Sequence, residues 1–488
     1  MLLDPGVIVP SPATAPFAAD RAPGWIGVAP GAPYFVDEAG APWTPIGQND
    51  AISWPELAPL YRRRDPEAVE RHLRGLKAQG VTCLRLMLEY AQGRHRYLER
   101  PTGRFVPAMV QLWDDLFALC ERTGLRILLT PVDTYWTWVR FRHHPWNVGN
   151  GGPLANMRDA LLRGVTRAAI KARLEFAVRR WGGSGALFAW DLWNEIHPAQ
   201  SRDSTDGWDD FIHDLSGHVR GLEQRLYGRS HPQTVSLFGP ELILKPHLAP
   251  AMREAVFRHP DVDFASLHIY AKGSIDNPRD TVAPALAMAA IVAESIGEIR
   301  DGRPFLDTEH GPIHAFKDRH RTLPEPFDDE MFRHCSWAHL AAGGAGGGMR
   351  WPNRHPHVLT AGMRRAQQAM VGFLPEIDWP RFRRRPFGAG LRARHVHAVG
   401  CGDERQALIW LVRRDGLGSD GRLREGLVPV RTSVAVPGLA DGRYRVRGWD
   451  TLRGEAAETM AAEAAGGMLH FTTAELTSDR AFAIAPAA

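Results

Sequence analysis

Cysteine, excess charge and long apolar runs are all scarce in this chain of 488 residues. The four cysteines are far apart in the sequence, which argues against a disulfide scaffold and against a thiolate metal site. The formal net charge is only +4, and the arginine runs at 62–64 and 383–385 are short and isolated. Because nucleic-acid binding requires a broad basic face, we expect no nucleic-acid partner.

No apolar run is long enough to span a membrane, so we expect no membrane association. Residues 1–20 have neither the basic start nor the long apolar stretch of a secretory signal, which predicts a cytoplasmic protein. Nothing in the sequence indicates an oligomeric state.

Tryptophan, by contrast, occurs 16 times. The indole N–H needs a hydrogen-bond partner when it is buried, so tryptophan is a demanding residue in a core. Tryptophans in loop-like segments can instead serve as flat apolar platforms, and the C–H faces of sugar rings suit such platforms.

Strand-like apolar runs alternate with amphipathic helical stretches between residues 31 and 375, after a small hairpin at 34–47. Strands are expected after this hairpin, at 81–88, 125–130, 186–193, 234–238, 264–268 and 304–308, and in a glycine-rich segment ending at Trp351. Helices are expected at 66–79, 108–123, 158–181, 207–227, 249–258, 281–299, 327–342 and 361–373. Eight strand-then-helix units predict an α/β fold, a (β/α)8 TIM barrel. A doubly wound open sheet is disfavoured, because no glycine-rich phosphate turn follows the first strand.

The pattern changes near residue 376, and a chain of this length is expected to form more than one domain. Short alternating segments at 407–412, 431–436, 444–449 and 468–472 predict an antiparallel β-sandwich, whereas 456–467 is expected to be a loop. We therefore predict a lead-in (1–30), a barrel with its hairpin (31–375) and an accessory β-sandwich domain (376–488). The sandwich is expected to stabilise the barrel by docking an apolar face on its helices, with Trp410 buried.

Carboxylates follow several of the predicted barrel strands, and this is where the reacting groups of barrel enzymes lie. They are Glu89, Asp133, Glu195, Glu241 and Glu309. Cleavage of a glycosidic bond needs two carboxyl groups, one to protonate the leaving oxygen and one to attack the sugar or to activate water.

Two of these carboxylates stand in recognisable segments. Glu195 ends the segment WDLWNE at 190–195, and Glu309 lies in LDTEHG at 306–311. The pair resembles the clan A glycoside hydrolases, in particular the cellulase-like family 5 and its neighbours. In that family an Asn-Glu after strand four supplies the acid/base, and a Glu after strand seven supplies the nucleophile.

Further landmarks of the family follow in the same order along residues 30–375. Arg85 lies in LRL on strand two, His268 and Tyr270 lie in LHIY after strand six, and Trp351 falls where the family keeps a tryptophan beneath the sugar. One segment departs from the family. The residues after strand three read DTYWTW at 133–138, without the family's commonest histidine pattern.

The resemblance implies a retaining glycoside hydrolase that cleaves β-glycosidic bonds by double displacement. Glu195 would be the acid/base, with a raised pKa, and Glu309 the ionised nucleophile, hydrogen-bonded by Arg85 and Tyr270. Asn194 would bind a sugar hydroxyl. The expected partner is an oligosaccharide or glycoside substrate, and the resemblance implies no cofactor.

Several residues keep two interpretations. His268 could be a core histidine. Trp136 and Trp138 could be packing residues or sugar platforms, and Glu89 and Glu241 could contact substrate or form ion pairs. The segment His355-Pro356-His357 resembles a metal pair only superficially, so we expect no metal. Two other functions remain open: a transglycosylase acting on a glycan, and a carbohydrate-binding pseudoenzyme.

Overall fold

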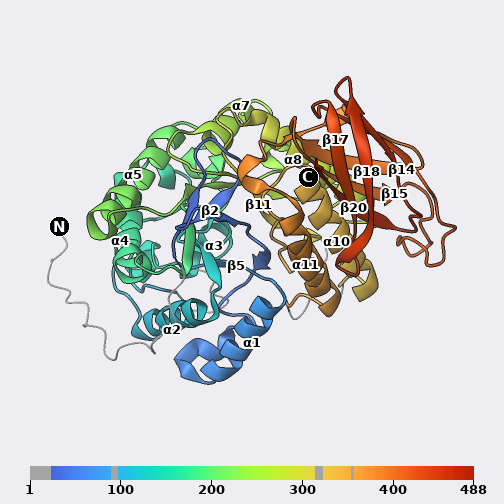
Figure 1. Ribbon diagram of the computed structural model, residues 1–488. Helices are drawn as coiled ribbons and strands as arrows, with labels where there is room; N and C mark the ends of the chain where they lie inside the picture. The colour runs from blue at the N-terminus through green and yellow to red at the C-terminus, as the bar shows by residue number, and fades with distance from the viewer. Residues whose placement is uncertain (1–23, 89–96, 314–321, 353–356, 488) are drawn as a thin grey trace.

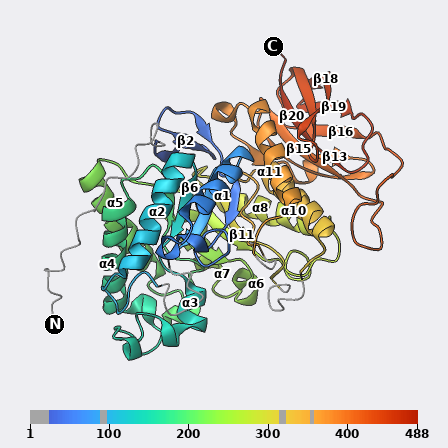
Figure 2. The same cartoon turned by 90° about the horizontal axis from the view of Figure 1, so that it is seen from below.

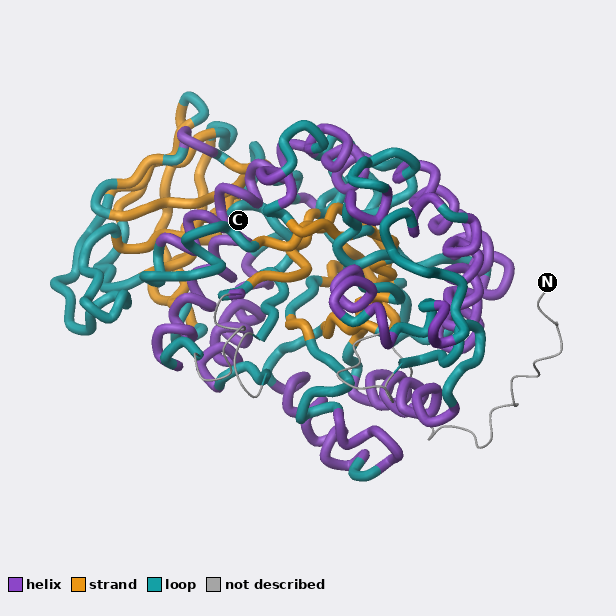
Figure 3. The backbone as a smooth tube through the Cα atoms, turned by 180° about the vertical axis from the view of Figure 1, so that it is seen from behind, coloured by secondary structure: helices purple, strands orange, loops and turns teal. Residues whose placement is uncertain are grey.

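The computed structural model describes residues 24–88, 97–313, 322–352 and 357–487, and it places a barrel beside a separate β domain (Figure 1). Parallel strands gather at the centre of the barrel with helices around them (Figure 3). The first strands pair in the order β4-β5-β6-β7-β8, and a second group pairs as β9-β10-β11. Their bounds are β4 (Gly47–Asn49), β5 (Cys83–Met87), β6 (Arg126–Thr130), β7 (Leu187–Asp191), β8 (Gln233–Thr234), β9 (Ser236–Phe238), β10 (Ala265–Ile269) and β11 (Phe305–His310).

The ring of strands closes through one residue. Strands β8 and β9 follow each other across Val235 and together fill the fifth position. Arg350 forms parallel bridges to Gln48 of β4 on one side and to His310 of β11 on the other. The (β/α)8 barrel is therefore confirmed, but its eighth strand is a single bridge residue rather than the expected segment.

Glycines explain why the eighth position has no regular strand. Three glycines of the preceding segment, Gly343, Gly346 and Gly348, adopt positive φ angles that other residues avoid. At Gly346 a Cβ atom would lie 2.1 Å from the carbonyl oxygen of Pro45, so no side chain fits there. The backbone turns repeatedly where a strand would have to run straight.

The predicted helices surround the barrel with small shifts at their ends. They are α1 (Pro66–Ala78), α2 (Pro107–Thr123), α4 (Gly164–Trp181), α5 (Trp208–Tyr227), α7 (Ala249–Arg253), α8 (Ala283–Glu298), α10 (Glu325–Ala341) and α11 (Ala361–Phe373). Helix α4 starts later than expected, after a separate 3-10 turn at Ala160–Leu162, and α7 continues into a π-helical turn at Glu254–Arg258. Among the described residues, no helix has both the length and the apolar character that a membrane crossing requires.

A three-stranded hairpin layer, β1 (Ile26–Val28), β2 (Phe35–Asp37) and β3 (Pro42–Trp43), contacts the apolar interior of the barrel. The buried ring of Phe35 meets Phe188 and Phe264 edge-on, at centroid distances of 5.0 and 5.4 Å. Strand β1 lies inside the expected lead-in of residues 1–30, so that boundary falls too late. The pairing of β1 with β2 was not visible as a periodic pattern, because β1 has only three residues.

The C-terminal domain is one antiparallel sheet of nine strands that curls over on itself. Its strands are β12 (Arg385–Pro386), β13 (Arg392–Ala393), β14 (Val396–Gly402), β15 (Ala407–Arg413), β16 (Ser433–Pro437), β17 (Gly442–Asp450), β18 (Glu455–Ala465), β19 (Met468–Thr472) and β20 (Asp479–Pro486). Side chains from β15 and β20 share one apolar cluster with side chains from β16 and β19, so the two halves enclose a common core as in a sandwich.

The expectation of a loop at 456–467 is wrong, because β18 occupies most of that segment. Its alanine and glutamate residues bury little apolar surface, and most of them are exposed. The strand exists because it pairs with β17 along the whole of that strand and with the start of β19. Backbone hydrogen bonds to the neighbouring strands hold β18 in place, so its sequence does not need the alternating apolar residues that usually identify a strand.

The outer face of the sheet docks on the barrel, at the side where α10 lies (Figure 2). Trp410 of β15 and Trp449 of β17 belong to the same apolar cluster as the barrel helices, and Trp410 is fully buried as expected. A buried carboxylate reinforces this contact. Asp479 accepts hydrogen bonds from Arg333 of α10 at 2.9 Å and from the Trp410 indole at 3.0 Å.

We predict that Asp479→Asn destabilises the protein by about 3–5 kcal/mol at neutral pH, because the buried Arg333 loses its counter-charge. Burial opposes ionisation, but the charges of Arg333 and His334 hold the pKa of Asp479 well below its ordinary value. A depressed pKa contributes stability above the unfolded pKa of about 3.9 that is lost as pH falls through the lower folded value. The difference between the two proteins should therefore stay constant from pH 8 to 5 and shrink only below about pH 4, measured by denaturant unfolding.

Asp415→Asn is the matched control, since Asp415 pairs with Arg413 but is 68% exposed. It should change stability little. Equal losses in both variants would contradict the role given to the interdomain carboxylate.

Candidate active site

Arg85 lies at the centre of the C-terminal mouth of the barrel, on β5, and its side chain is fully buried. Its Nη1 donates to Asn49 Oδ1 at 2.8 Å and to Glu309 Oε2 at 3.1 Å. Its Nη2 donates to Asp191 Oδ2 at 2.8 Å and also to Asn194 Oδ1. The guanidinium on β5 thus links three other barrel strands or their loops, namely β4, β7 and β11.

Glu309 lies on β11 and is held by donors on two sides. Besides the contact with Arg85, the Tyr270 hydroxyl donates to Glu309 Oε1 at 2.5 Å. His268 Nδ1 lies 3.6 Å from Glu309 Oε2. His268 lies on β10, and Tyr270 is the first residue after that strand. The His-x-Tyr spacing matters because side chains at alternate positions of a strand point to the same side.

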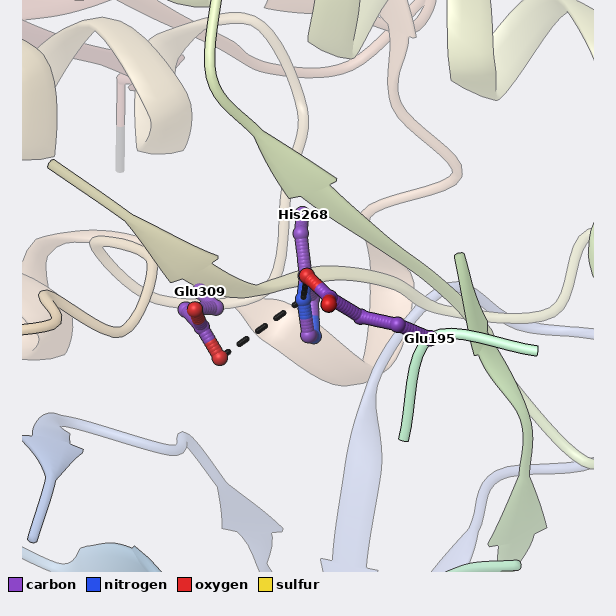
Figure 4. A group of neighbouring side chains, drawn as sticks. All are labelled: Glu195, His268 and Glu309. Atoms are coloured by element: carbon purple, nitrogen blue, oxygen red, sulfur yellow. Dashed lines mark hydrogen bonds and ion pairs between the residues drawn. The ribbon is translucent and has the colours of Figure 1, made fainter. Parts of the chain in front are cut away.

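Glu195 follows β7 and reaches the same space from the opposite side (Figure 4). Its Oε1 lies 2.8 Å from His268 Nδ1, so the histidine is placed between the two glutamates. The backbone φ of Glu195 is +54°, a left-handed conformation that costs free energy in a non-glycine residue. Its N–H donates to Ser236 Oγ at 3.1 Å, which helps to hold that conformation.

Burial dominates the electrostatics of this cluster. It raises the pKa of Glu195 to about 7, which the charge of Arg85 only partly offsets. Burial also raises the pKa of Glu309, and the charge of Arg85 and the hydrogen bond from Tyr270 act in the opposite direction. The pKa of His268 falls to about 4 because its ring is buried, and that of Tyr270 rises well above its ordinary value. The histidine is therefore neutral and the tyrosine stays a donor at neutral pH.

Among the described residues, Glu195, His268 and Glu309 are also the group whose donor atoms could hold a metal ion, since those atoms lie within 4.8 Å of one another. Arg85 already places a positive charge against Glu309. A divalent cation bound to the same carboxylate would have to share the space with that guanidinium. The contacts of the cluster therefore need no metal to explain them, and the absence of a metal stays a prediction.

Asn194 and Asp133 lie beside this cluster and are both buried. The Asn194 amide donates to Asp133 Oδ1 at 2.7 Å, while Asp133 also accepts from the N–H of Tyr135 at 3.0 Å. Asp133 thus caps α3 (Thr134–Val139) and orients Asn194 at the same time.

The predicted aromatic residues divide into two groups. Trp136 and Trp351 are 5% and 9% exposed and pack in one cluster with Trp54, whose ring meets Trp351 edge-on at 5.2 Å. Trp138 is 56% exposed. His357 stacks on Trp54 at 4.9 Å.

Two further carboxylates, Glu241 and Glu89, are predicted from the sequence to contact substrate or to form ion pairs. Glu241, at the start of α6 (Glu241–Leu244), forms an ion pair with His197, Nε2 to Oε1 at 3.3 Å. Glu89 lies outside the described residues, as does His355.

No protein-family model matches the chain, and no curated protein matches its sequence. Solved structures do match. A family 5 glycoside hydrolase from Bacteroides vulgatus ATCC 8482 gives a TM-score of 0.59 at 11% identity, over 95% of this chain and 94% of that chain. Another structure described as a glycoside hydrolase gives 0.58 at 12% identity, over 95% and 97%. This chain has their fold.

The endo-beta-1,4-mannanase from Thermotoga petrophila is a third structural neighbour, with a TM-score of 0.50 at 13% identity over 88% of this chain and 91% of that one. The expected resemblance to family 5 is thus confirmed for the glycoside hydrolase fold. Both domains take part in the first two matches, since these cover 95% of the chain.

Sequence reasoning missed three residues that support the cluster: Asn49, Asp191 and Ser236. Asp191 Oδ1 accepts from the Ser236 N–H at 3.0 Å, and its Oδ2 accepts from the Ser236 hydroxyl at 2.9 Å. The Asn49 amide donates to the carbonyl oxygens of Thr308 and Met349 at 2.9 and 3.1 Å. Asp191 stands within the segment WDLWNE, so its place on a buried strand was a usable signal.

The raised pKa of Glu195 predicts a pH-dependent cost to folding. The folded protein keeps the Glu195 proton up to about pH 7, whereas the unfolded chain releases it near pH 4.5. Stability from this group is therefore complete below pH 4.5 and is lost as pH rises through 7. Glu195→Gln does not titrate, so it should gain up to about 3 kcal/mol relative to the natural protein between pH 4.5 and 8.

Denaturant unfolding of both proteins across this pH range measures the difference. Glu241→Gln is the contrasting variant, because the hydrogen bond with His197 lowers the pKa of Glu241. It should lose stability, rather than gain it, at neutral pH. A difference between Glu195→Gln and the natural protein that does not change with pH would contradict the assignment.

Proposed function

We propose that this protein is a retaining β-glycoside hydrolase in which Glu309 is the nucleophile and Glu195 the acid/base. The observation that carries the proposal is the pairing of these two carboxyl groups at the barrel mouth, with their nearest oxygens within 4.8 Å. Retaining enzymes separate the two carboxyl groups by about 5–5.5 Å, whereas inverting enzymes need about 6.5–9.5 Å to admit a water molecule.

The surroundings of the two groups favour this division of roles. Glu309 receives hydrogen bonds from a guanidinium and a phenol, which stabilise a carboxylate. Among the residues that the structure describes, none is a cationic hydrogen-bond donor to Glu195 in this way, and its pKa of about 7 lets it hold a proton at neutral pH. A nucleophile must be ionised and a general acid must be protonated, so each group is suited to one role.

In the first step, Glu309 attacks the anomeric carbon of the sugar, and the bond to the leaving oxygen breaks as Glu195 donates its proton to that oxygen. A glycosyl ester of Glu309 forms. In the second step, Glu195, now ionised, takes a proton from a water molecule that attacks the same carbon and releases Glu309. Neutral His268 keeps the Glu195 side chain in place through both steps.

The remaining predicted residues contact or orient the sugar in this proposal. Asn194 is fixed by Asp133 and Arg85 and keeps an amide hydrogen for a sugar hydroxyl. Trp351, with Trp54 against its edge, offers an indole surface beneath the sugar. β-Mannosides belong in the first substrate panel together with β-glucosides, since one structural neighbour is a β-mannanase.

Glu309→Gln should reduce kcat at least about a thousandfold on every substrate, because the covalent intermediate cannot form. Glu195→Ala should reduce turnover strongly for alkyl glycosides but much less for dinitrophenyl glycosides, whose leaving groups need little protonation. Added azide should accelerate Glu195→Ala and give a β-glycosyl azide. Initial rates and NMR of the first product measure these effects.

Glu294→Gln, an exposed glutamate on α8, is the control and should retain full activity. An α-configured azide product would rule out double displacement. Near-normal rates for Glu309→Gln would remove that residue from the nucleophile role.

Dialysis against a chelator should leave the activity unchanged, because two carboxyl groups perform this reaction without a metal. The measurement is kcat/KM before and after treatment, with Zn²⁺, Mn²⁺ and Mg²⁺ added back separately. Loss of activity that one of these ions restores would mean that Glu195, His268 and Glu309 serve as ligands instead.

A further inference from the structure

The strand that carries Glu309 contains one extra residue. In the pairing of β11 with β10, Asp307 lies opposite Leu267 and Glu309 lies opposite His268, so two steps along β11 match one step along β10. The extra residue is Thr308, and an insertion of this kind is a β-bulge. Bulges are frequent beside active sites, where they turn a side chain to a new direction.

Contacts with β10 show what this bulge does to Glu309. Ser266 and His268 are two positions apart on β10 and therefore point to the same side. The Thr308 hydroxyl lies 2.6 Å from the Ser266 hydroxyl, and Glu309 lies beside His268 (Figure 4). Thr308 and Glu309 are consecutive residues, yet both side chains point to that side, which a regular strand does not allow.

The residues on either side of the bulge point the other way. His310 Nδ1 lies 2.7 Å from Asp307 Oδ2, although the two residues are three positions apart. In a regular strand, Glu309 would share the side of Asp307, since these two are separated by one residue. The bulge at Thr308 therefore turns the proposed nucleophile toward the barrel mouth.

Backbone pairing with the glycine-rich closing segment shows which group the bulge displaces. The Met349 N–H donates to the carbonyl oxygen of Asp307 at 2.9 Å. In a regular parallel pairing, the N–H two residues later, that of Glu309, would donate to the carbonyl oxygen of Met349. The N–H of His310 does so instead, at 3.2 Å. The bulge has thus moved the Glu309 N–H out of the ladder.

The Asp307 side chain receives this displaced N–H. Asp307 is fully buried, and its Oδ1 accepts from the Glu309 N–H at 3.2 Å. A buried N–H without an acceptor costs free energy, so this hydrogen bond favours the bulged form of the strand. Gly348 leaves room for the carboxylate, because a Cβ atom at that position would lie 2.8 Å from Asp307 Oδ2.

We propose that Asp307 is a positioning residue for the reaction. By accepting the Glu309 N–H it holds the bulge at Thr308, and it thereby keeps the nucleophile directed into the barrel mouth. This inference rests on the proposed function, because it concerns the attack by Glu309 on the sugar. Asp307 acts through the backbone of its neighbour, so it sets the geometry of the attack and not its acid–base chemistry.

Two shape-matched substitutions separate the hydrogen bond from packing. Leucine has the branched outline of aspartate without an acceptor, whereas asparagine keeps one acceptor oxygen for the Glu309 N–H. The probes are dinitrophenyl β-glucoside and β-mannoside with fluorine in place of the sugar 2-hydroxyl. The Glu309 carboxylate displaces dinitrophenolate from the anomeric carbon and stays attached as a glycosyl ester, which the fluorine makes slow to hydrolyse. Release of dinitrophenolate and the mass of the intact protein report this attack directly.

Asp307→Leu should be labelled at least about a hundredfold more slowly than the natural protein, because a small misplacement of a reacting group has this effect. The probe concentration at half the maximal rate should change less than about threefold. Asp307→Asn should restore the rate to within about tenfold of the natural value. Asp307→Ala also lacks the acceptor and repeats the test without the bulk of leucine.

Asp114→Leu is the matched control. Asp114 accepts hydrogen bonds from Arg180 at 2.7 and 2.6 Å and from the Trp181 indole at 3.0 Å, between α2 and α4. This substitution should lower the stability, measured by denaturant unfolding, and leave the labelling rate unchanged. A loss of stability alone would therefore not reproduce the effect expected at Asp307.

A crystal structure of Asp307→Leu gives a readout that needs no turnover, and Glu309 should no longer be hydrogen-bonded to Tyr270. Labelling at the natural rate, or an unmoved Glu309, would overturn the positioning role and leave the proposed function standing. Equal losses in Asp307→Leu and Asp307→Asn would also overturn it. A displaced Glu309, with natural protein that neither reacts with the probes nor hydrolyses any glycoside, would remove the proposed function and keep Asp307 as the residue that directs Glu309.

Discussion

A buried guanidinium has to be neutralised by nearby negative charge, and the side chains at the barrel mouth meet this requirement for Arg85. Its hydrogen bonds reach two carboxylates, Asp191 and Glu309. A third carboxyl group, Glu195, lies in the same cluster, and one cation cannot balance three negative charges in a medium of low dielectric constant. Glu195 holds its proton up to about pH 7, because burial raises its pKa and the charge of Arg85 only partly offsets that effect.

Much of the fold follows from apolar periodicity. The helix at 361–373 and the strand at 468–472 have the bounds that the pattern predicts, and other elements shift by a few residues. Long elements are predictable because each buries one face, and the apolar residues of that face recur at a regular spacing in the sequence. The elements that were missed, β1 and β18, are held by pairing with neighbours. Their stability depends on residues distant in sequence, which no local pattern records.

The candidate site could be predicted in part. Arg85, Glu309, Tyr270 and His268 meet in space as their segments indicate, because the C-terminal ends of parallel strands converge. Asn49 and Ser236 were not predicted, since an amide and a hydroxyl acquire their roles only from the groups that they face. The distinction between Trp136, which packs, and Trp138, which is exposed, likewise depends on the turn of α3 and not on residue type.

The single bridge residue at the eighth position affects how the protein is made. The edge of β4 is paired by Arg350, which lies about 300 residues later in the chain, and the buried Arg350 is itself held by Asp328 at 2.6 Å. During synthesis from the N-terminus, seven strands can assemble while that edge is still open. An open edge can pair with other chains, so the nascent protein passes through a stage that favours aggregation. Ring closure is consequently a late, long-range event that depends on a glycine-rich turn and one arginine.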